Sequence, residues 1–263
     1  FKPVYSFGIR RMHPAISPMI DRSAYIGGCD GFSGVAGGKL MGLPPVGTIP
    51  HALMIVAGDR VRAWKAFDEV VSKEVPRIIL VDTFSDEVVE SLSAARALGE
   101  KLYAVRLDTP ASRRGNMRRI IEEVRWKLDV EGYKDVKIFV SGGLNEKTLR
   151  ELCDVADAFG VGTFISSART VDFAMDIVEV DGRPVAKRGK LSGSKNVFEC
   201  PRCHTRRLSL EDGPPRCDCG EEMSALLKPL IRGGRVVADL PPATEIRRFV
   251  LDQIKERNLA LDV

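Results

Sequence analysis

The fold is decided by residues 76–108, which read PRIILVDTFSDEVVESLSAARALGEKLYAVRLD. A short apolar run ends at Asp82, an amphipathic helical segment follows, and a second apolar run over 102–105 leads into Arg106 and Asp108. Continuous apolar runs of this length are typical of strands covered on both faces, as in a parallel sheet. The stretch therefore predicts a strand–helix–strand unit whose strands both end in charged residues.

The same pattern continues downstream. An amphipathic helix over 117–128 precedes an apolar run at 136–140, and a helix capped by Asn145 precedes Gly160-Val161-Gly162-Thr163. Residues 23–56, rich in glycine and short apolar stretches, indicate earlier units of the same layer. Strands and helices that alternate in this way predict an α/β fold, either a barrel or a doubly wound sheet. Both folds build their sites at the carboxyl ends of the strands.

Composition narrows the class of protein. The 263 residues are 44% hydrophobic and 29% charged, which excludes disorder as the dominant state. The net charge of +4 is too small to argue for nucleic-acid binding by itself. No apolar run approaches the ~18–20 residues of a membrane span, and no signal-peptide pattern opens the chain. Because the chain begins at Phe1 without an initiator Met, we expect a processed product or a piece of something longer.

Four of the six cysteines are clustered. Two residues separate Cys200 from Cys203, thirteen residues follow, and one residue separates Cys217 from Cys219. Four thiolates at this spacing can close a tetrahedral Zn²⁺ site, which would be structural because no ligand position is open. The alternatives are four unrelated free thiols, or His204 in place of one cysteine. Such cysteine usage is typical of a reducing compartment, so we expect a cytoplasmic protein.

Glycine-rich turns follow two consecutive predicted strands, at Ser141-Gly142-Gly143 and at Gly160-Val161-Gly162-Thr163. Each turn alone is more often structural than a ligand site. Together, backbone N–H groups at adjacent helix starts form a cup that suits phosphate. The pair of turns therefore predicts a phosphate site.

The remaining candidates are single charged residues. His51 is either a catalytic group or a satisfied core or capping residue. Asp82 and Asp108 fit a Mg²⁺ ion bound through water beside a phosphate substrate. Arg10 either grips an anionic ligand or is solvated, and the arginine-rich run 113–119 is most simply the polar face of a helix.

Taken in order, these residues resemble the nicotinate phosphoribosyltransferases of the archaeal type, which carry a zinc knuckle. Any one matching block is weak, but the set covers about residues 5–198 in the family's order. The blocks are FGIRR at 7–11, YIGGCDG at 25–31, AGGKL at 36–40, GTIPH at 47–51, VDT at 81–83, RLD at 106–108, SGGL at 141–144, FGVGT at 159–163, VEVDG at 178–182 and PVAK at 184–187.

The resemblance implies a type II phosphoribosyltransferase with an irregular or incomplete (β/α) barrel, followed by a small zinc-knuckle module. Such enzymes join nicotinate to phosphoribosyl pyrophosphate (PRPP), giving nicotinate mononucleotide and pyrophosphate in NAD salvage. ATP hydrolysis is coupled through a phosphorylated histidine that matches His51, and Thr48 and Arg106 match residues that hold nicotinate. The residues that match the PRPP and phosphate site are Arg10, Gly142, Gly143, Gly160, Gly162 and Thr163.

The resemblance also implies Mg²⁺ with PRPP and ATP, and a homo-oligomer, a dimer or larger, with sites near an interface. It implies small-molecule substrates and neither nucleic acid nor membrane as partners. The family carries a further N-terminal α/β region ahead of the block at 7–11, and we expect that region to be missing here or to lie on a separate chain. Ile49-Pro50 stands where relatives often have less restrictive residues, and proline fixes the backbone before His51.

The predicted domains are a barrel over 1–196, a zinc-knuckle module over 197–223 and a C-terminal extension over 224–263. The extension is predicted to hold an amphipathic helix from Ala243 to Leu261 with Leu259 on its apolar face. A hairpin is predicted at 176–185 around Asp181-Gly182, a dipeptide that favours tight turns.

Two alternative functions stay open. Quinolinate phosphoribosyltransferase shares the fold and an anionic pyridine substrate, although the blocks at 7–11 and 47–51 favour nicotinate. A zinc-ribbon nucleic-acid-binding protein belongs to a different class and rests on Arg202, Arg206 and Arg207 beside the cysteines. That alternative predicts polynucleotide binding that falls steeply with salt.

Overall fold

The computed structural model describes residues 2–210 and 213–257. The chain divides into two units, one made of residues 1–169 and 241–263 and the other of residues 170–240. The domain boundaries predicted from the sequence, at 196/197 and 223/224, differ from these. The three predicted domains stay a prediction.

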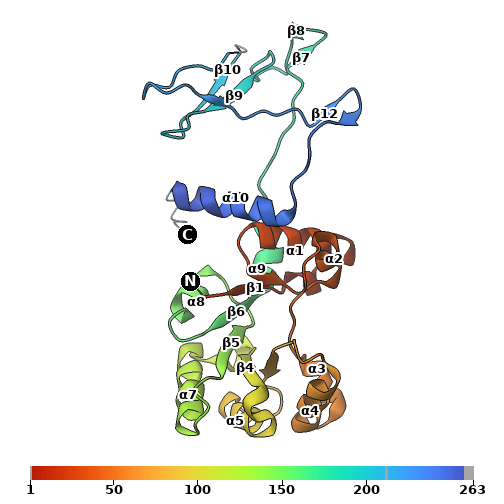
Figure 1. Ribbon diagram of the computed structural model, residues 1–263, viewed down its shortest axis with the longest axis vertical. Coiled ribbons are helices and arrows are strands. Elements are labelled where there is room, and N and C mark those ends of the chain that lie inside the picture. The colour runs from red at the N-terminus through yellow and green to blue at the C-terminus, as the bar shows by residue number, and fades with distance from the viewer. Residues whose placement is uncertain (1, 211–212, 258–263) are drawn as a thin grey trace. The chain divides into compact units, whose positions relative to one another are not determined.

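Six parallel strands form a curled half-barrel in the first unit (Figure 1). The strands are β1 (Val4–Ser6), β2 (Gly31–Phe32), β3 (Arg77–Leu80), β4 (Leu102–Leu107), β5 (Lys137–Ser141) and β6 (Ala158–Val161), in the order β2-β1-β6-β5-β4-β3. This confirms the predicted α/β architecture with an incomplete barrel. The short strands β1 and β2 extend the sheet beyond β6, so the glycine-rich N-terminal stretch does contribute to the same layer.

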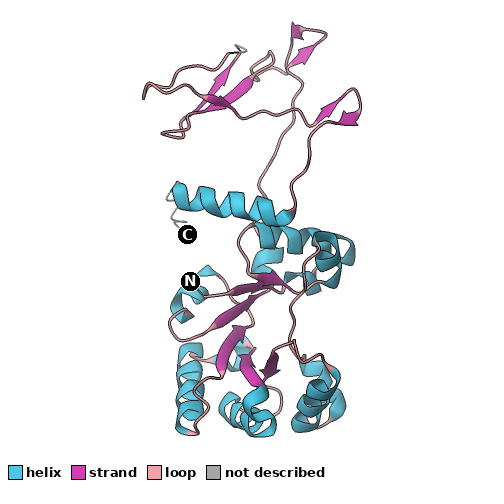
Figure 2. Ribbon diagram, viewed as in Figure 1, coloured by secondary structure: helices cyan, strands magenta, loops and turns pink. Residues whose placement is uncertain are grey.

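Helices fill the connections between the strands (Figure 2). Three of them pack side by side: α4 (Arg60–Val70), α5 (Glu87–Leu98) and α7 (Met117–Val130). Their apolar faces share one core with the sheet, in which Trp64 and Ile121 are fully buried. The other helical elements of this part are η1 (Gly8–Arg11), η2 (Pro14–Ile16), α1 (Ser17–Ile26), α2 (Val35–Met41), α3 (His51–Ala57), η3 (Gly99–Lys101), α6 (Ala111–Arg114), α8 (Glu146–Leu152) and α9 (Thr163–Ser166).

Short polar side chains determine where several helices begin. Asp59, Asp86, Asn116 and Asn145 each accept a hydrogen bond from the backbone N–H three residues later, which satisfies one of the unpaired donors of the first turn. Asp86 and Asn145 cap the first helices after β3 and β5, so these two caps also fix loops at the carboxyl ends of strands.

The arginine-rich run 113–119 is not the face of one helix, and that interpretation was wrong. α6 ends at Arg114, and Gly115 has a φ of 53°, a left-handed conformation that suits glycine. Asn116 then caps the separate helix α7. The break places Arg114 on α6 and Arg118 and Arg119 on α7.

The C-terminal helix α10 (Ala243–Glu256) packs on α1 within the first unit. Arg247 carries this contact, because its guanidinium donates hydrogen bonds to the carbonyl oxygens of Tyr25 and Cys29 at 2.5 Å. The predicted continuation to Leu261, and with it Leu259, lies outside the described residues. Within the described residues no helix is long and apolar enough to cross a membrane.

The second unit, residues 170–240, consists of short antiparallel strands. The predicted hairpin is confirmed: β7 (Glu179–Val180) pairs with β8 (Arg183–Pro184), and Asp181 and Gly182 both have positive φ. A three-stranded sheet joins β9 (Asn196–Glu199), β10 (Arg206–Ser209) and β11 (Ser224–Ala225). β12 (Ile231–Arg232) pairs with β13 (Arg235–Val236).

Candidate active site and cysteine cluster

The carboxyl ends of β3 and β4 bring His51 and two aspartates together. His51 is the first residue of α3, and its Nε2 lies 2.9 Å from Oδ1 of Asp82, which lies two residues after the end of β3. Asp82 is almost fully buried, at 3% exposure of its side chain, whereas His51 keeps 36%. A carboxylate only accepts hydrogen bonds, so the contact favours the tautomer with the proton on Nε2 and leaves the Nδ1 lone pair available.

Asp82 and Asp108 are linked through the backbone. The N–H of Asp108 donates to Oδ2 of Asp82 at 2.9 Å, so both oxygens of Asp82 are engaged. Oδ1 of Asp108 accepts a hydrogen bond from the hydroxyl of Ser141 at 2.8 Å. The remaining oxygen, Oδ2 of Asp108, lies 4.0 Å from Nδ1 of His51 and 3.6 Å from Nη2 of Arg106. That oxygen is the least engaged acceptor of the pair.

Arg106 points from β4 into the same space. Its Nη1 donates to the hydroxyl of Thr48 at 2.6 Å, and its guanidinium lies 5.9 Å from the centre of the Phe7 ring. Burial lowers the pKa of Arg106, and the carboxylates of Asp108 and Asp82 oppose that shift. Its Nε is buried and has no hydrogen-bond partner among the described residues. A buried N–H without a partner is costly, so this donor suits an anionic ligand.

The two glycine-rich turns lie at neighbouring strand ends, as predicted, because Ser141 on β5 pairs with Gly160 on β6. Gly142 has a φ of 87°, and a Cβ there would lie 3.0 Å from Oδ1 of Asp108. A Cβ on Gly160 would lie 2.5 Å from the Phe7 ring. Both glycines are therefore required by close packing around the site.

The second turn continues into Gly162, which precedes the short helix α9 that begins at Thr163. Arg10 is exposed on η1, which packs against α9 through Gly8. A Cβ on Gly8 would lie 3.2 Å from the carbonyl oxygen of Gly162. The positive charge of Arg10 also contributes to the lowered pKa of Arg106, which puts the two guanidinium groups within electrostatic range of each other.

Sequence analysis missed Arg114 as a part of this region. Its guanidinium donates to the carbonyl oxygens of Thr109, at 3.0 and 3.1 Å, and of Gly142, at 2.5 Å. It therefore ties the loop after β4 to the loop after β5. The signal that could have found it is Gly115-Asn116, a helix stop followed by a helix cap.

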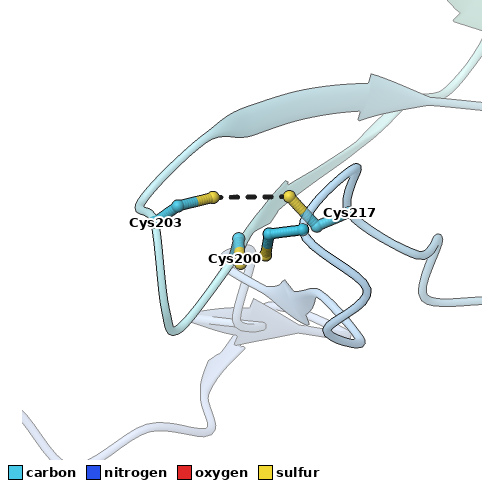
Figure 3. Close-up of side chains that lie close together, drawn as sticks. Cys200, Cys203 and Cys217 are labelled. Atoms are coloured by element: carbon cyan, nitrogen blue, oxygen red, sulfur yellow. Dashed lines mark hydrogen bonds between the residues drawn. The ribbon is translucent and has the colours of Figure 1, made fainter.

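The four cysteines of the second unit lie together (Figure 3). Their Sγ atoms all lie within 4.8 Å of one another, and the sulfurs of Cys203 and Cys217 are 3.4 Å apart. Ligand sulfurs at ~2.3 Å from zinc are ~3.8 Å apart in a tetrahedron, so this donor set fits a zinc ion. All six cysteines are free. The hydroxyl and backbone N–H of Thr205 lower the pKa of Cys203 to about 6, which favours the thiolate that metals bind.

The residues around the cluster bear on two alternatives from the sequence: His204 as a metal ligand and the nearby arginines as a nucleic-acid surface. His204 is not a member of the four-sulfur group; it has a φ of 57°, and its Nδ1 lies 3.6 Å from Glu199. Arg206 pairs with Glu199 at 2.7 Å and Arg207 with Asp218 at 2.6 Å. Two of the three arginines proposed to bind nucleic acid are therefore neutralised by carboxylates, which weakens that alternative.

Comparison with known proteins identifies what the half-barrel is similar to. The family described as "Quinolinate phosphoribosyl transferase, C-terminal domain" matches residues 2–176. Nicotinate phosphoribosyltransferase pncB1 of Mycobacterium tuberculosis is 31% identical over 255 residues, covering 90% of this chain and 55% of the relative. Nicotinate phosphoribosyltransferase pncB2 of the same organism is 29% identical over 263 residues, covering 93% of this chain and 54% of the relative. The chain thus spans about half the length of these curated relatives.

Two solved structures share the fold. Nicotinate-nucleotide pyrophosphorylase from Pyrococcus furiosus superposes with a TM-score of 0.92 at 62% identity, over 98% of this chain and 67% of that chain. Human nicotinic acid phosphoribosyltransferase superposes with a TM-score of 0.69 at 20% identity, over 97% of this chain and 64% of that chain. The second match is evidence for the fold alone.

Proposed function

This chain belongs to the type II phosphoribosyltransferases, in the family of the quinolinate phosphoribosyl transferase C-terminal domain, and we propose that it carries the active site of a nicotinate phosphoribosyltransferase. The observation that carries the proposal is Arg106, a buried arginine beside Thr48 and Phe7 whose Nε has no partner in the described part of the chain. A guanidinium next to an aromatic ring suits a flat ring that bears one carboxylate, which describes nicotinate.

In the proposed reaction the ring nitrogen of nicotinate attacks C1 of the PRPP ribose. The N–C1 bond forms while the C1–O bond breaks, and pyrophosphate leaves with the bonding electrons. The protein's contribution is to hold two anions in line, so that most of the rate enhancement comes from positioning and charge stabilisation. Arg106 and Thr48 would hold nicotinate, and Arg10, Gly142, Gly143, Gly160, Gly162 and Thr163 would hold the phosphate groups.

We propose that ATP is coupled to this reaction through His51. Nε2 of His51 is engaged by Asp82, so the lone pair on Nδ1 is the nucleophile. An Nδ1–P bond forms, the bond from the γ-phosphorus to its bridging oxygen breaks, and ADP leaves with the electrons. The Nε2 proton stays shared with Asp82, which stabilises the positive charge on the ring.

Magnesium fits the same region. Both oxygens of Asp82 are engaged by protein donors, whereas Oδ2 of Asp108 is the least engaged acceptor. Asp108 is therefore the residue we propose as the protein ligand, with Asp82 acting on His51 instead. The ion would neutralise charge on the pyrophosphate.

We further propose that Cys200, Cys203, Cys217 and Cys219 bind one structural zinc ion, because the donor set is complete without water. We also propose that the reaction serves NAD salvage and that two or more copies assemble, both from the resemblance of the motifs to the family. A cytoplasmic location is proposed from the clustered cysteines, whose spacing is typical of a reducing compartment.

The test is a calorimetric titration with PRPP and Mg²⁺, followed by nicotinate and, separately, by quinolinate. We expect PRPP to bind first and nicotinate to bind in preference to quinolinate. Quinolinate binding in preference would establish the second candidate, which the name of the matching family favours. The titration is repeated after adding the portion of the Pyrococcus furiosus relative that lies outside the match. No binding in that mixture would contradict the proposal.

A further inference from the structure

Two glutamates of α5 are buried close to the site. Glu87 and Glu90 lie in the first turn of α5 and are 5% and 0% exposed. Acidic residues are common in the first turn because they complement the helix dipole, but they normally remain in solvent. These two instead face the loops that follow β3 and β4.

Glu90 holds the loop that follows Asp82. Its carboxylate accepts the backbone N–H groups of Thr83 at 3.1 Å, of Phe84 at 2.6 Å and of Ser85 at 2.8 Å. Arg60 of α4 lies 3.8 Å from the same carboxylate and donates to the Ser85 hydroxyl at 2.9 Å. Three consecutive N–H groups bound to one buried carboxylate give this loop a single conformation.

Glu87 holds the loop that follows Asp108. Its Oε1 accepts a hydrogen bond from the hydroxyl of Thr109 at 2.7 Å, and Thr109 is fully buried. Thr109 also presents its carbonyl oxygen to Arg114, which reaches on to Gly142. A continuous set of hydrogen bonds therefore runs from α5 through the loop after β4 to the loop after β5.

We propose that Glu90 and Glu87 are positioning residues, with which α5 fixes Asp82 and Asp108 at the separation that orients His51. The consequence for catalysis rests on the proposed function, but the orientation of His51 does not. Both carboxylate oxygens of Asp82 are hydrogen-bonded, one to His51 and the other to the backbone N–H of Asp108. A shift of the loop must therefore change the His51 contact.

The decisive variant is Glu90→Gln, which keeps the shape of the side chain. One amide oxygen can still accept from Phe84 and Ser85, but the amide NH₂ then faces the N–H of Thr83, donor against donor. The bond nearest to Asp82 is lost. The matched control is Glu123→Gln, because Glu123 is an exposed glutamate of α7 and undergoes the same chemical change.

The first readout is the tautomer of His51, measured from the ¹⁵N shifts of its ring in long-range ¹H–¹⁵N spectra at pH 8. The chain has three histidines, so assignment by substitution of His13 and His204 is direct. We expect the wild type and Glu123→Gln to show the proton on Nε2, and Glu90→Gln to show a mixture of tautomers. An unchanged Nε2 tautomer in folded Glu90→Gln would overturn the proposal.

The second readout is kinetic. We expect kcat of the ATP-stimulated reaction to fall ~10²-fold in Glu90→Gln, the effect of misplacing a reacting group by about 1 Å, while the KM for nicotinate changes less than twofold. A purely structural role would lower the amount of active enzyme without changing the ring shifts of the remaining folded protein. If the wild type shows no turnover even after the unmatched portion of the Pyrococcus furiosus relative is added, the proposed function fails, and the ¹⁵N spectra still decide this inference.

A second pair of variants covers a Glu90→Gln protein that does not fold. Thr109→Val keeps the shape but removes the hydroxyl that Glu87 accepts, and Thr109→Ser keeps the hydroxyl but removes a methyl group. We expect Thr109→Val to show a mixture of His51 tautomers and Thr109→Ser to keep the wild-type tautomer. Equal spectra for the two variants would contradict the role of Glu87.

Discussion

Asp82 accepts the backbone N–H of Asp108 with one carboxylate oxygen, while its other oxygen holds His51. Two strand ends that are neighbours in the sheet are thereby locked to each other by a side chain rather than by the strand ladder. The histidine depends on this lock, because it lies on α3 and reaches the sheet through Asp82.

Asp82→Asn should therefore reduce catalysis more than binding. When the amide oxygen accepts the Asp108 N–H, the amide NH₂ faces Nε2 of His51 and favours the opposite tautomer, which puts the proton on Nδ1 and removes the lone pair there. We expect ATP-stimulated kcat to fall ~10²–10⁴-fold, the range for removal of an acid–base partner. Turnover measured with and without ATP checks this. A matching fall without ATP would place Asp82 in phosphoribosyl transfer itself.

Arg106→Lys should weaken nicotinate binding while PRPP binding is kept. Lysine preserves the charge but loses the planar donors that reach Thr48 and leave Nε–H for the ligand. Loss of one charged hydrogen bond costs ~1.5–3 kcal/mol, or about 10–150-fold in affinity. Calorimetry with each substrate measures the split. Arg119→Lys, at an exposed position of α7, is the control and should leave both affinities unchanged.

Loss of the zinc ion should destabilise the unit formed by residues 170–240. We expect one zinc per chain by elemental analysis, and we expect Cys217→Ser to lose it, because a buried sulfur of the four-ligand set is missing. Limited proteolysis should then cut within 170–240 and spare the half-barrel. Cys153→Ser changes an exposed cysteine outside the cluster and should retain zinc. Full zinc content in Cys217→Ser would refute the assignment.

Asp21 should make the protein less stable as pH rises. The carboxyl is fully buried against Gly34 and Gly37, with no side-chain donor among the described residues. Burial raises the pKa of Asp21 to about 6, and the Gly34 backbone N–H offsets only part of the rise. The native state thus prefers the protonated form, whose stabilisation is complete below about pH 4 and is lost as pH rises through 6.

Asp21→Asn removes that ionisation. We expect the variant to gain stability over the wild type between pH 4 and pH 7, by up to about 3 kcal/mol, since each pKa unit corresponds to about 1.4 kcal/mol. Urea unfolding at both pH values gives the difference. A gap between the two proteins that does not change with pH would show that Asp21 titrates normally.

Gly160→Ala should displace the ring of Phe7, which lies beside Arg106. The added methyl group would lie 2.5 Å from the Phe7 ring and 3.0 Å from Phe139, so Phe7 must move away from Arg106. We expect a loss of about 1–3 kcal/mol in unfolding free energy, typical of overpacking, together with weaker nicotinate binding. Gly213→Ala, where no described residue lies within 4 Å of the new atom, should change neither.

Much of the half-barrel could be predicted from the sequence, because buried parallel strands are continuous apolar runs. β3 to β6 appear at the predicted places, and their ends carry the predicted residues. β1 was not predicted, since it has three residues and its hydrogen-bonding partners lie far away in the sequence. A strand of that length has no periodicity to detect.

The candidate site shows a similar division. Thr48, His51, Asp82, Arg106 and Asp108 were all singled out, and the structure brings them into one connected set. Glu90 and Arg114 were not, because a glutamate in the first turn or an arginine in a basic run looks the same whether it faces solvent or a loop. Their contacts depend on how α5 and α6 pack, which sequence periodicity does not specify.

The position of β1 also limits when this part of the sheet can form during synthesis. Tyr5 pairs with Gly31 on one side and with Gly160 on the other, so β1 emerges from the ribosome long before its second neighbour exists. Until β6 is synthesised, β1 and β2 present an unpaired edge, and Phe7 has no Gly160 to pack on. Packing of Phe7 on Gly160 beside Arg106 therefore requires β6, and the edge of β1 stays open to other partners until β6 has been synthesised.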